Sequence, residues 1–79
     1  MRTLLVAERG RAAALSNAVE AFQDFGCDLV SAPSWAVANS LLLEDEFQAV
    51  LVSSADADEL TRTVRSARQL VPEAAILAV

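Results

Sequence analysis

The sequence predicts an α/β fold in which a parallel sheet lies between two layers of helices. Short apolar runs alternate along the 79 residues with longer stretches that carry apolar residues every three or four positions. Three of the four runs are apolar at consecutive positions, which is typical of parallel strands covered on both faces. Strands alternating with helices of this length imply right-handed crossovers, so the expected order is β-α-β-α-β-α-β.

The apolar runs define the expected strands. Residues 4–7, 49–52 and 75–79 are apolar throughout, whereas 28–32 mixes polar and apolar residues, as an outer strand does. The fourth run ends the chain, and no helix follows to cover it. Because a bare apolar edge strand is a template for association, we expect either a fragment of a longer protein or a second copy that covers this strand.

The first expected helix spans residues 11–25 and is followed by Gly26, a plausible helix stop. Its apolar stripe contains Ala12, Leu15, Ala18, Val19 and Phe22.

Two further helices are expected, at residues 34–46 and 57–70. Ser34 is a candidate N-cap for the former, and Asp56 or Asp58 for the latter. Pro72 blocks continuation of the last helix. The residues expected to be buried are Ala38, Leu41 and Leu42, then Leu60, Val64, Ala67, Leu70 and Val71.

Composition narrows the class of protein. The net charge is −5, with no His and no Lys, so the overall field disfavours direct contact with nucleic acid. The lone Cys27 excludes an intrachain disulfide and a cysteine metal site, and is expected to be a small buried hydrophobe. No apolar run approaches the roughly 20 residues of a membrane helix, and the stretch of residues 1–7 is too short for the apolar core of a signal peptide. We expect a cytoplasmic protein without a cofactor.

Four stretches resemble a bacterial response-regulator receiver domain, in the right order: RTLLVAER (2–9), CDLVSAPSWAVANSLL (27–42), FQAVLVSS (47–54) and LVPEAAILAV (70–79). The resemblance implies a flavodoxin-like (CheY-like) sheet. It covers the whole chain but only about two-thirds of a receiver, since the family's last strands and helices are absent. It therefore implies the N-terminal part of a longer regulator.

The residues that carry receiver chemistry are missing. Receivers hold Mg²⁺ with an acidic pair after the first strand and with the phospho-acceptor Asp after the third. Here the pair reads Ala7-Glu8, and the acceptor position is Ser53. A serine hydroxyl is a poor nucleophile without an activating base, and the chain has no His. We expect no catalytic residue, no phospho-acceptor and no metal site, with Glu8 as the residual metal candidate or a solvated carboxylate.

Other groups have two interpretations. One acidic cluster consists of Asp56, Asp58 and Glu59. It either holds Mg²⁺ together with Glu8 or caps a helix N-terminus. Arg62, Arg65 and Arg68 form a partner-binding face, or a solvated helix face paired locally with Asp58 and Glu59. Trp35 is an exposed anchor or packs over a helix end. The predicted interaction residues are Trp35, Arg62, Arg65, Arg68, Ile76, Leu77 and Val79.

Three hypotheses of function follow. The first is a non-enzymatic receiver-like module that acts by forming a homodimer or by contacting an effector domain, such as that of a transcriptional regulator. The second is a phosphate- or nucleotide-binding half-domain, with Arg9, Ser53 and Ser54 as contacts near Glu8. The third is a receiver phosphorylated at Asp56, the nearest carboxylate after the third strand.

Overall fold

A computed structural model of the chain describes residues 2–24, 26 and 28–78. Strands and helices alternate as expected, with the first helical stretch divided in two. In chain order the elements are β1 (Arg2–Val6), α1 (Arg9–Ala14), α2 (Ser16–Asp24), β2 (Asp28–Ala32), α3 (Trp35–Glu44), β3 (Ala49–Val52), α4 (Ala57–Leu70) and β4 (Ala75–Ala78).

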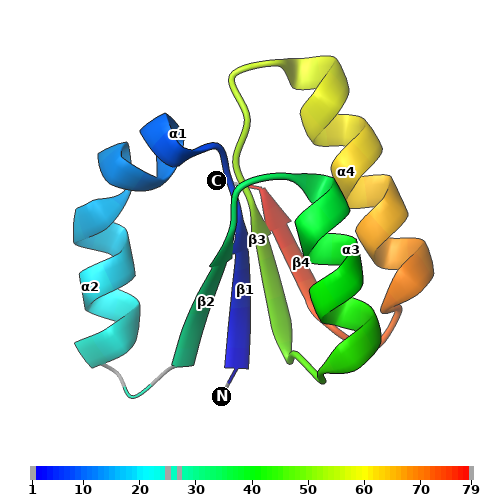
Figure 1. Cartoon of the computed structure of the whole chain (residues 1–79), viewed down its shortest axis with the longest axis horizontal. Helices are drawn as coiled ribbons and strands as arrows, with labels where there is room; N and C mark the ends of the chain where they lie inside the picture. Colours follow the sequence, from blue (N-terminus) through cyan, green and yellow to red (C-terminus); the bar gives the residue numbers. More distant parts are fainter. Residues whose placement is uncertain (1, 25, 27, 79) are drawn as a thin grey trace.

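The four strands form one parallel sheet in the order β2-β1-β3-β4. Figure 1 shows α1 and α2 on one face of this sheet and α3 and α4 on the other, so the predicted three-layer α/β architecture is confirmed. The strand order is compatible with a flavodoxin-like fold. No described helix is long and apolar enough to cross a lipid bilayer.

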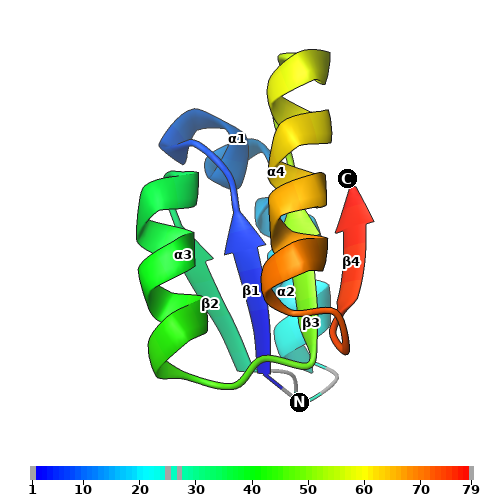
Figure 2. The ribbon, with the colours of Figure 1, turned by 90° about the vertical axis from the view of Figure 1, so that its right-hand side faces the viewer.

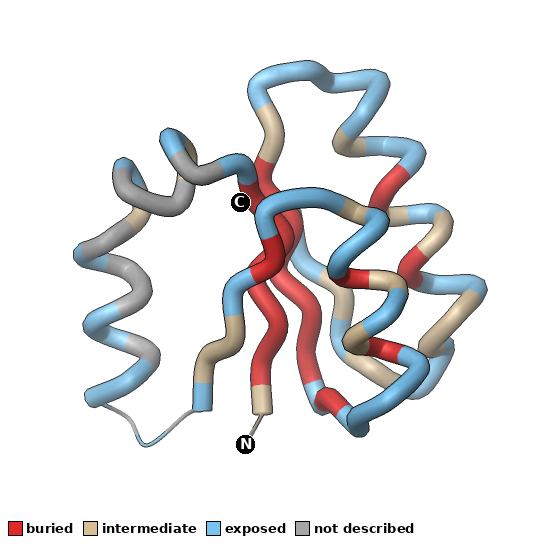
Figure 3. Tube along the Cα trace, in the orientation of Figure 1, coloured by how far each residue is buried: buried red, intermediate tan, exposed pale blue. Residues whose placement is uncertain are grey.

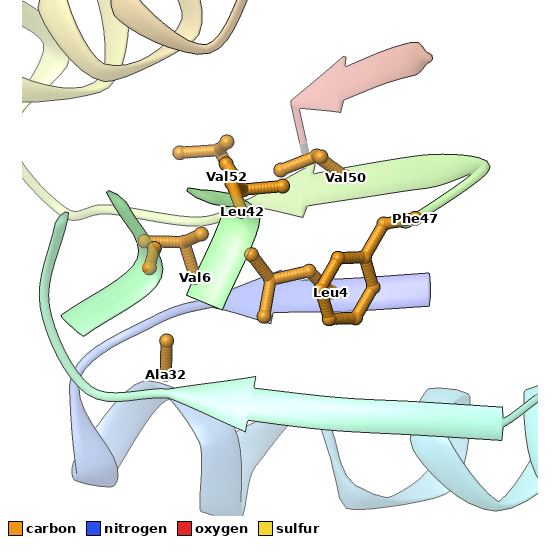
Figure 4. Close-up of a cluster of buried hydrophobic side chains, with 8 residues drawn as sticks. Leu4, Val6, Ala32, Leu42, Phe47, Val50 and Val52 are labelled. Carbon is orange, nitrogen blue, oxygen red and sulfur yellow. The ribbon is translucent and has the colours of Figure 1, made fainter. Parts of the chain in front are cut away.

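The core lies around the two central strands, β1 and β3, because both of their faces are covered (Figure 3). Under α3 and α4 the buried side chains are large and apolar, and Figure 4 shows how they converge. This cluster contains Leu4, Val6, Ala32, Ala38, Leu42, Phe47, Val50 and Val52. Leu41, Leu60, Val64, Leu70 and Val71 pack against it half-buried, while Ala67 is fully buried, so the stripes predicted for the last two helices are confirmed.

The opposite face of the sheet has a smaller core of Leu5, Ala7 and Leu51, with Leu15 and Leu29 packed against it. The two outer strands are more exposed than the central pair. β2 is an edge strand of mixed burial, as its sequence predicts. β4 forms the other edge, and Leu77 on it is 52% exposed.

The prediction of one helix over residues 11–25 is wrong. The stretch forms α1 and α2, separated by a turn at Leu15. Ser16 and Asn17 follow that turn, and such residues compete with helical backbone bonding and favour helix ends. Gly26 has φ +78°, the left-handed conformation of a glycine that ends a helix. The predictions for Ala12, Ala18, Val19 and Phe22 as core side chains, and for Cys27, lie outside what the structure describes.

Local capping signals in the sequence are confirmed. The Ser34 side chain accepts a hydrogen bond from the Val37 amide at the start of α3, and Asp56 caps α4. The acidic end of α3, which suits the helix dipole poorly, has a compensating cation from β1. Arg2 lies 3.4 Å from the Asp45 carboxylate, and its guanidinium sits 5.0 Å from the centre of the Phe47 ring.

We expect Thr3→Val to stabilise the fold. The Thr3 side chain is fully buried on β1, and its hydroxyl has no hydrogen-bond partner among the described residues. Replacing an unsatisfied buried hydroxyl by a methyl group of the same shape should raise the free energy of unfolding by about 1 kcal/mol. Urea denaturation followed by Trp35 fluorescence measures it. Thr61→Val, on the exposed face of α4, is the control, and a loss of stability in Thr3→Val would contradict the argument.

Candidate functional site

The carboxyl ends of β1 and β3 lie side by side in the middle of the sheet, where α/β proteins bind ligands. Ser53 follows β3 directly, and Glu8 lies two residues beyond the end of β1. The Ser53 amide donates to the Val6 carbonyl at 3.0 Å, which continues the strand pairing by one residue. The Ser53 side chain is therefore held in place and is only 3% exposed.

An arginine from α1 occupies the space beside Ser53. The Arg11 Nε and Nη2 atoms both donate to Ser53 Oγ, at 3.2 and 3.1 Å. The guanidinium is half-buried there, so a positive charge lies beside the buried serine at the end of β3. Arg11 was not among the site residues predicted from the sequence. The available signal was a basic residue in the first helix after β1, at the end of the sheet to which Ser53 belongs.

The hollow beside Ser53 is too small for an organic ligand. Its volume is about 20 Å³, and its lining includes Glu8, Trp35, Ser53, Ser54 and Thr63. A single water molecule needs a cavity of roughly 10–15 Å³ on this measure. Trp35 packs half-buried against the main core, which favours its interpretation as a cover over the helix end.

The acidic loop after β3 is organised as a helix cap. The Asp56 carboxylate accepts hydrogen bonds from the Asp58 and Glu59 amides at 2.9 and 3.3 Å. Ser54 Oγ accepts from the Asp56 amide at 3.1 Å and donates to the Glu59 carboxylate at 3.5 Å. Asp56 therefore points at backbone amides in an exposed loop. No group of three potential metal ligands occurs among the described residues, and Glu8 is exposed.

Arg65 and Arg68 lie along a groove between α4 and β4. The groove has a volume of about 350 Å³, and Leu60, Val64 and Ala78 provide its apolar lining. Figure 2 shows α4 running beside β4 at this edge of the sheet. Neither arginine forms an ion pair with a described residue.

Arg62 does not line this groove, and its Nε donates to the Asp58 carbonyl at 3.4 Å. The local pairing expected with Asp58 is thus made to a backbone oxygen and not to the carboxylate. Ile76 and Leu77 point to opposite faces of β4: Ile76 packs against the main core under α3 and α4, and Leu77 is in register with Leu51 on the other face. Val79 and the Arg9 side chain lie outside what is described.

Neither the models of known protein families nor the curated proteins gave a match to this sequence. The fold and the geometry of these two regions therefore carry the functional argument.

The Arg11–Ser53 contact should couple α1 to β3 energetically. A double-mutant cycle with Arg11→Met and Ser53→Ala should give a coupling free energy of about 1 kcal/mol. Either single substitution already removes the hydrogen bonds between the two side chains, so the double variant should lose less stability than the sum of the two single losses. Urea unfolding of the four proteins measures it. Arg62→Met in place of Arg11→Met should show no coupling to Ser53→Ala. Additive effects in the first cycle would mean that the contact contributes nothing.

Asp56→Ala should lower the free energy of unfolding by about 1 kcal/mol, since two amides of the first turn of α4 lose their acceptor. Asp58→Ala removes an equally exposed carboxylate that caps nothing, so it should cost only a few tenths of a kcal/mol through the helix dipole. Thermal unfolding of both variants compares them. Equal destabilisation by the two changes would mean that Asp56 stabilises α4 through its negative charge alone and not through the two hydrogen bonds of the cap.

Proposed function

We propose that this chain is a receiver-like interaction module of bacterial signal transduction that acts by protein contact in the cytoplasm, without phosphotransfer. The proposal combines the four-segment resemblance with the parallel sheet order, which is compatible with a flavodoxin-like fold. The partner is a second copy or an effector domain, such as that of a transcriptional regulator.

The observation that carries the proposal is the Arg11–Ser53 contact. In a working receiver the corresponding corner of the sheet, where the first and third strands end, holds carboxylates, a metal ion and the arriving phosphoryl group. Here a guanidinium donates two hydrogen bonds to a buried serine, and Glu8 is the remaining carboxylate of the pair. A cation already bound at this corner disfavours a divalent metal, and no His is present to activate the serine hydroxyl.

The other two hypotheses have less support. A hollow of about 20 Å³ at the strand ends leaves no room for a nucleotide. Phosphorylation at Asp56 would weaken the cap of α4, because an acyl phosphate leaves a neutral carbonyl oxygen in place of the carboxylate oxygen that now accepts from two helix amides. Contact through an exposed face therefore remains the best-supported mode of action.

The exposed side of β4 is the face that we assign to contact. Leu77 is 52% exposed on an edge strand, next to the groove bordered by Arg65 and Arg68. Edge strands with exposed apolar side chains pair readily with other chains. Four of the predicted interaction residues lie at this edge of the sheet. Arg65 and Arg68 line the groove on the α4 side, Ile76 packs against the core on that side, and Leu77 lies on the opposite face of β4.

Light scattering over a concentration series tests the proposal. We expect the mass of the 79-residue chain to rise above the 8.4 kDa of one copy as concentration increases. Leu77→Lys should suppress this rise, because it places a charge on the contact face. Leu43→Lys is the matched control, since Leu43 is 68% exposed on α3, away from β4. A monomer at every concentration would contradict the assignment of this face.

Phosphotransfer is tested separately. The chain incubated with acetyl phosphate and Mg²⁺ should gain no phosphoryl mass. Incorporation that disappears in Asp56→Asn would overturn the proposal and favour the phosphorylated-receiver hypothesis.

A further inference from the structure

We propose that the groove between the ends of α3 and α4 binds an arginine-bearing, apolar segment of a partner protein. The groove lies at the amino edge of the sheet, where Figure 2 shows the connections from α3 to β3 and from α4 to β4. All of its lining comes from residues 42–48 and 70–74. The inference therefore goes beyond the contact face assigned to β4, because it concerns a different surface.

The floor of the groove is apolar. Leu42 and Phe47 belong to the main core and are nearly buried, and Leu70 and Val71 lie half-buried beside them. Figure 4 shows Phe47 at the end of that core where β3 begins. The groove has a volume of about 420 Å³, within the range of pockets that take ligands. A hydrated ion would leave this floor unused, so the fitting occupant has an apolar body.

The rim of the groove is acidic. Asp45, Glu46 and Glu73 line it and are exposed, and none of the described residues that line it is basic. Both helices also end here, and a helix C-terminus carries a partial negative charge. The last turn of α3 contains no basic residue to offset that charge. The combined field favours a cationic occupant.

The chain's own Arg2 indicates which cation suits this rim. Its guanidinium lies 3.4 Å from the Asp45 carboxylate and 5.0 Å from the centre of the Phe47 ring, so it combines an ion pair with a cation–π contact. Glu46 and Glu73 form no ion pair with a described residue. An arginine of a partner supplies a guanidinium for these carboxylates and an aliphatic stem for the apolar floor.

A second copy of the chain is a poorer occupant. The net charge of −5 makes two copies repel each other. The arginines of α4 share that helix with Asp58 and Glu59 in its first turn, so they would bring acidic groups toward an acidic rim. A segment whose charges are all positive fits the groove better.

The first test uses a fluorescein-labelled octapeptide of alternating Arg and Leu, mixed with the 79-residue chain. Octapeptides of alternating Glu and Leu and of alternating Arg and Ser are the controls for charge and for the apolar floor. Fluorescence anisotropy should show saturable binding of the Arg–Leu peptide, weakened by salt and about tenfold tighter than that of either control. Equal affinity for either control would overturn the proposal.

Charge variants locate the contact. Glu46→Gln with Glu73→Gln should weaken binding of the Arg–Leu peptide about tenfold. Glu20→Gln with Asp24→Asn removes the same charge from exposed positions of α2, on the other face of the sheet (Figure 1), and should change affinity less than about twofold. All four carboxylates are exposed, so urea unfolding should show that both variants fold. Equal weakening by the two pairs would mean general attraction to an acidic protein and would overturn the site.

NMR spectroscopy of the ¹⁵N-labelled chain provides a second measurement. Addition of the Arg–Leu peptide should shift amide signals within residues 42–48 and 70–74, the two stretches that line the groove. Shifts confined to other parts of the chain would overturn the assignment.

This inference and the proposed function fail in different ways. If the chain associates through Leu77 but does not prefer the Arg–Leu peptide, the basic partner is wrong and the contact face at β4 stands. If the peptide binds at the groove and the chain stays monomeric, the assignment of the β4 face is wrong and the groove stands. Self-association that is lost in Glu46→Gln with Glu73→Gln would mean that a second copy occupies the groove, which contradicts a separate partner.

Discussion

The parallel pairing of β1 with β3 is the constraint on which the rest of this small protein depends. Leu4 and Leu5 point to opposite faces of β1, and Val50 and Leu51 do the same on β3, yet all four are buried. Burial on both faces requires helices on both sides of the sheet, and parallel strands require long crossovers that supply them. The central pair therefore dictates the three layers seen in Figure 1.

The same pairing creates the corner at Ser53. Because parallel strands end at one edge of the sheet, Glu8 and Ser53 come together there, and α1 begins close enough for Arg11 to reach the serine. The result is a satisfied buried hydroxyl and a compensated half-buried cation, which favours rigidity at this edge. A corner built in this way is suited to holding α1 against β3.

The edge strand β4 differs from the central strands in how much of it is exposed. The central strands bury their side chains, whereas on β4 only Ile76 is partly buried and the other three residues are exposed (Figure 3). β4 is an edge strand among the described elements, and neither Arg65 nor Arg68 beside it forms an ion pair with a described residue. β1 and β3 thus provide the core, whereas β4 carries the surface that we propose for contact.

The sequence by itself determined the features that depend on neighbouring residues. Consecutive apolar residues predicted β3 with its bounds, and a stripe at helical spacing between Asp56 and Pro72 predicted α4. The caps at Ser34 and Asp56 were also predicted, since capping joins residues two or three apart. One local prediction, the single helix over 11–25, was wrong because the spacing of apolar residues continues across the turn at Leu15.

Only the tertiary structure decided the contacts between distant residues. Arg11 and Ser53 are 42 positions apart, and Arg2 on β1 meets Asp45 and Phe47 in the loop between α3 and β3. The groove at Arg65 and Arg68 exists because β4 folds back beside α4. The spacing of apolar residues indicates which face of a helix or strand is buried, but it does not specify which side chains from separate elements contact each other. Those meetings depend on strand order and crossover geometry, which are set by packing of the whole chain.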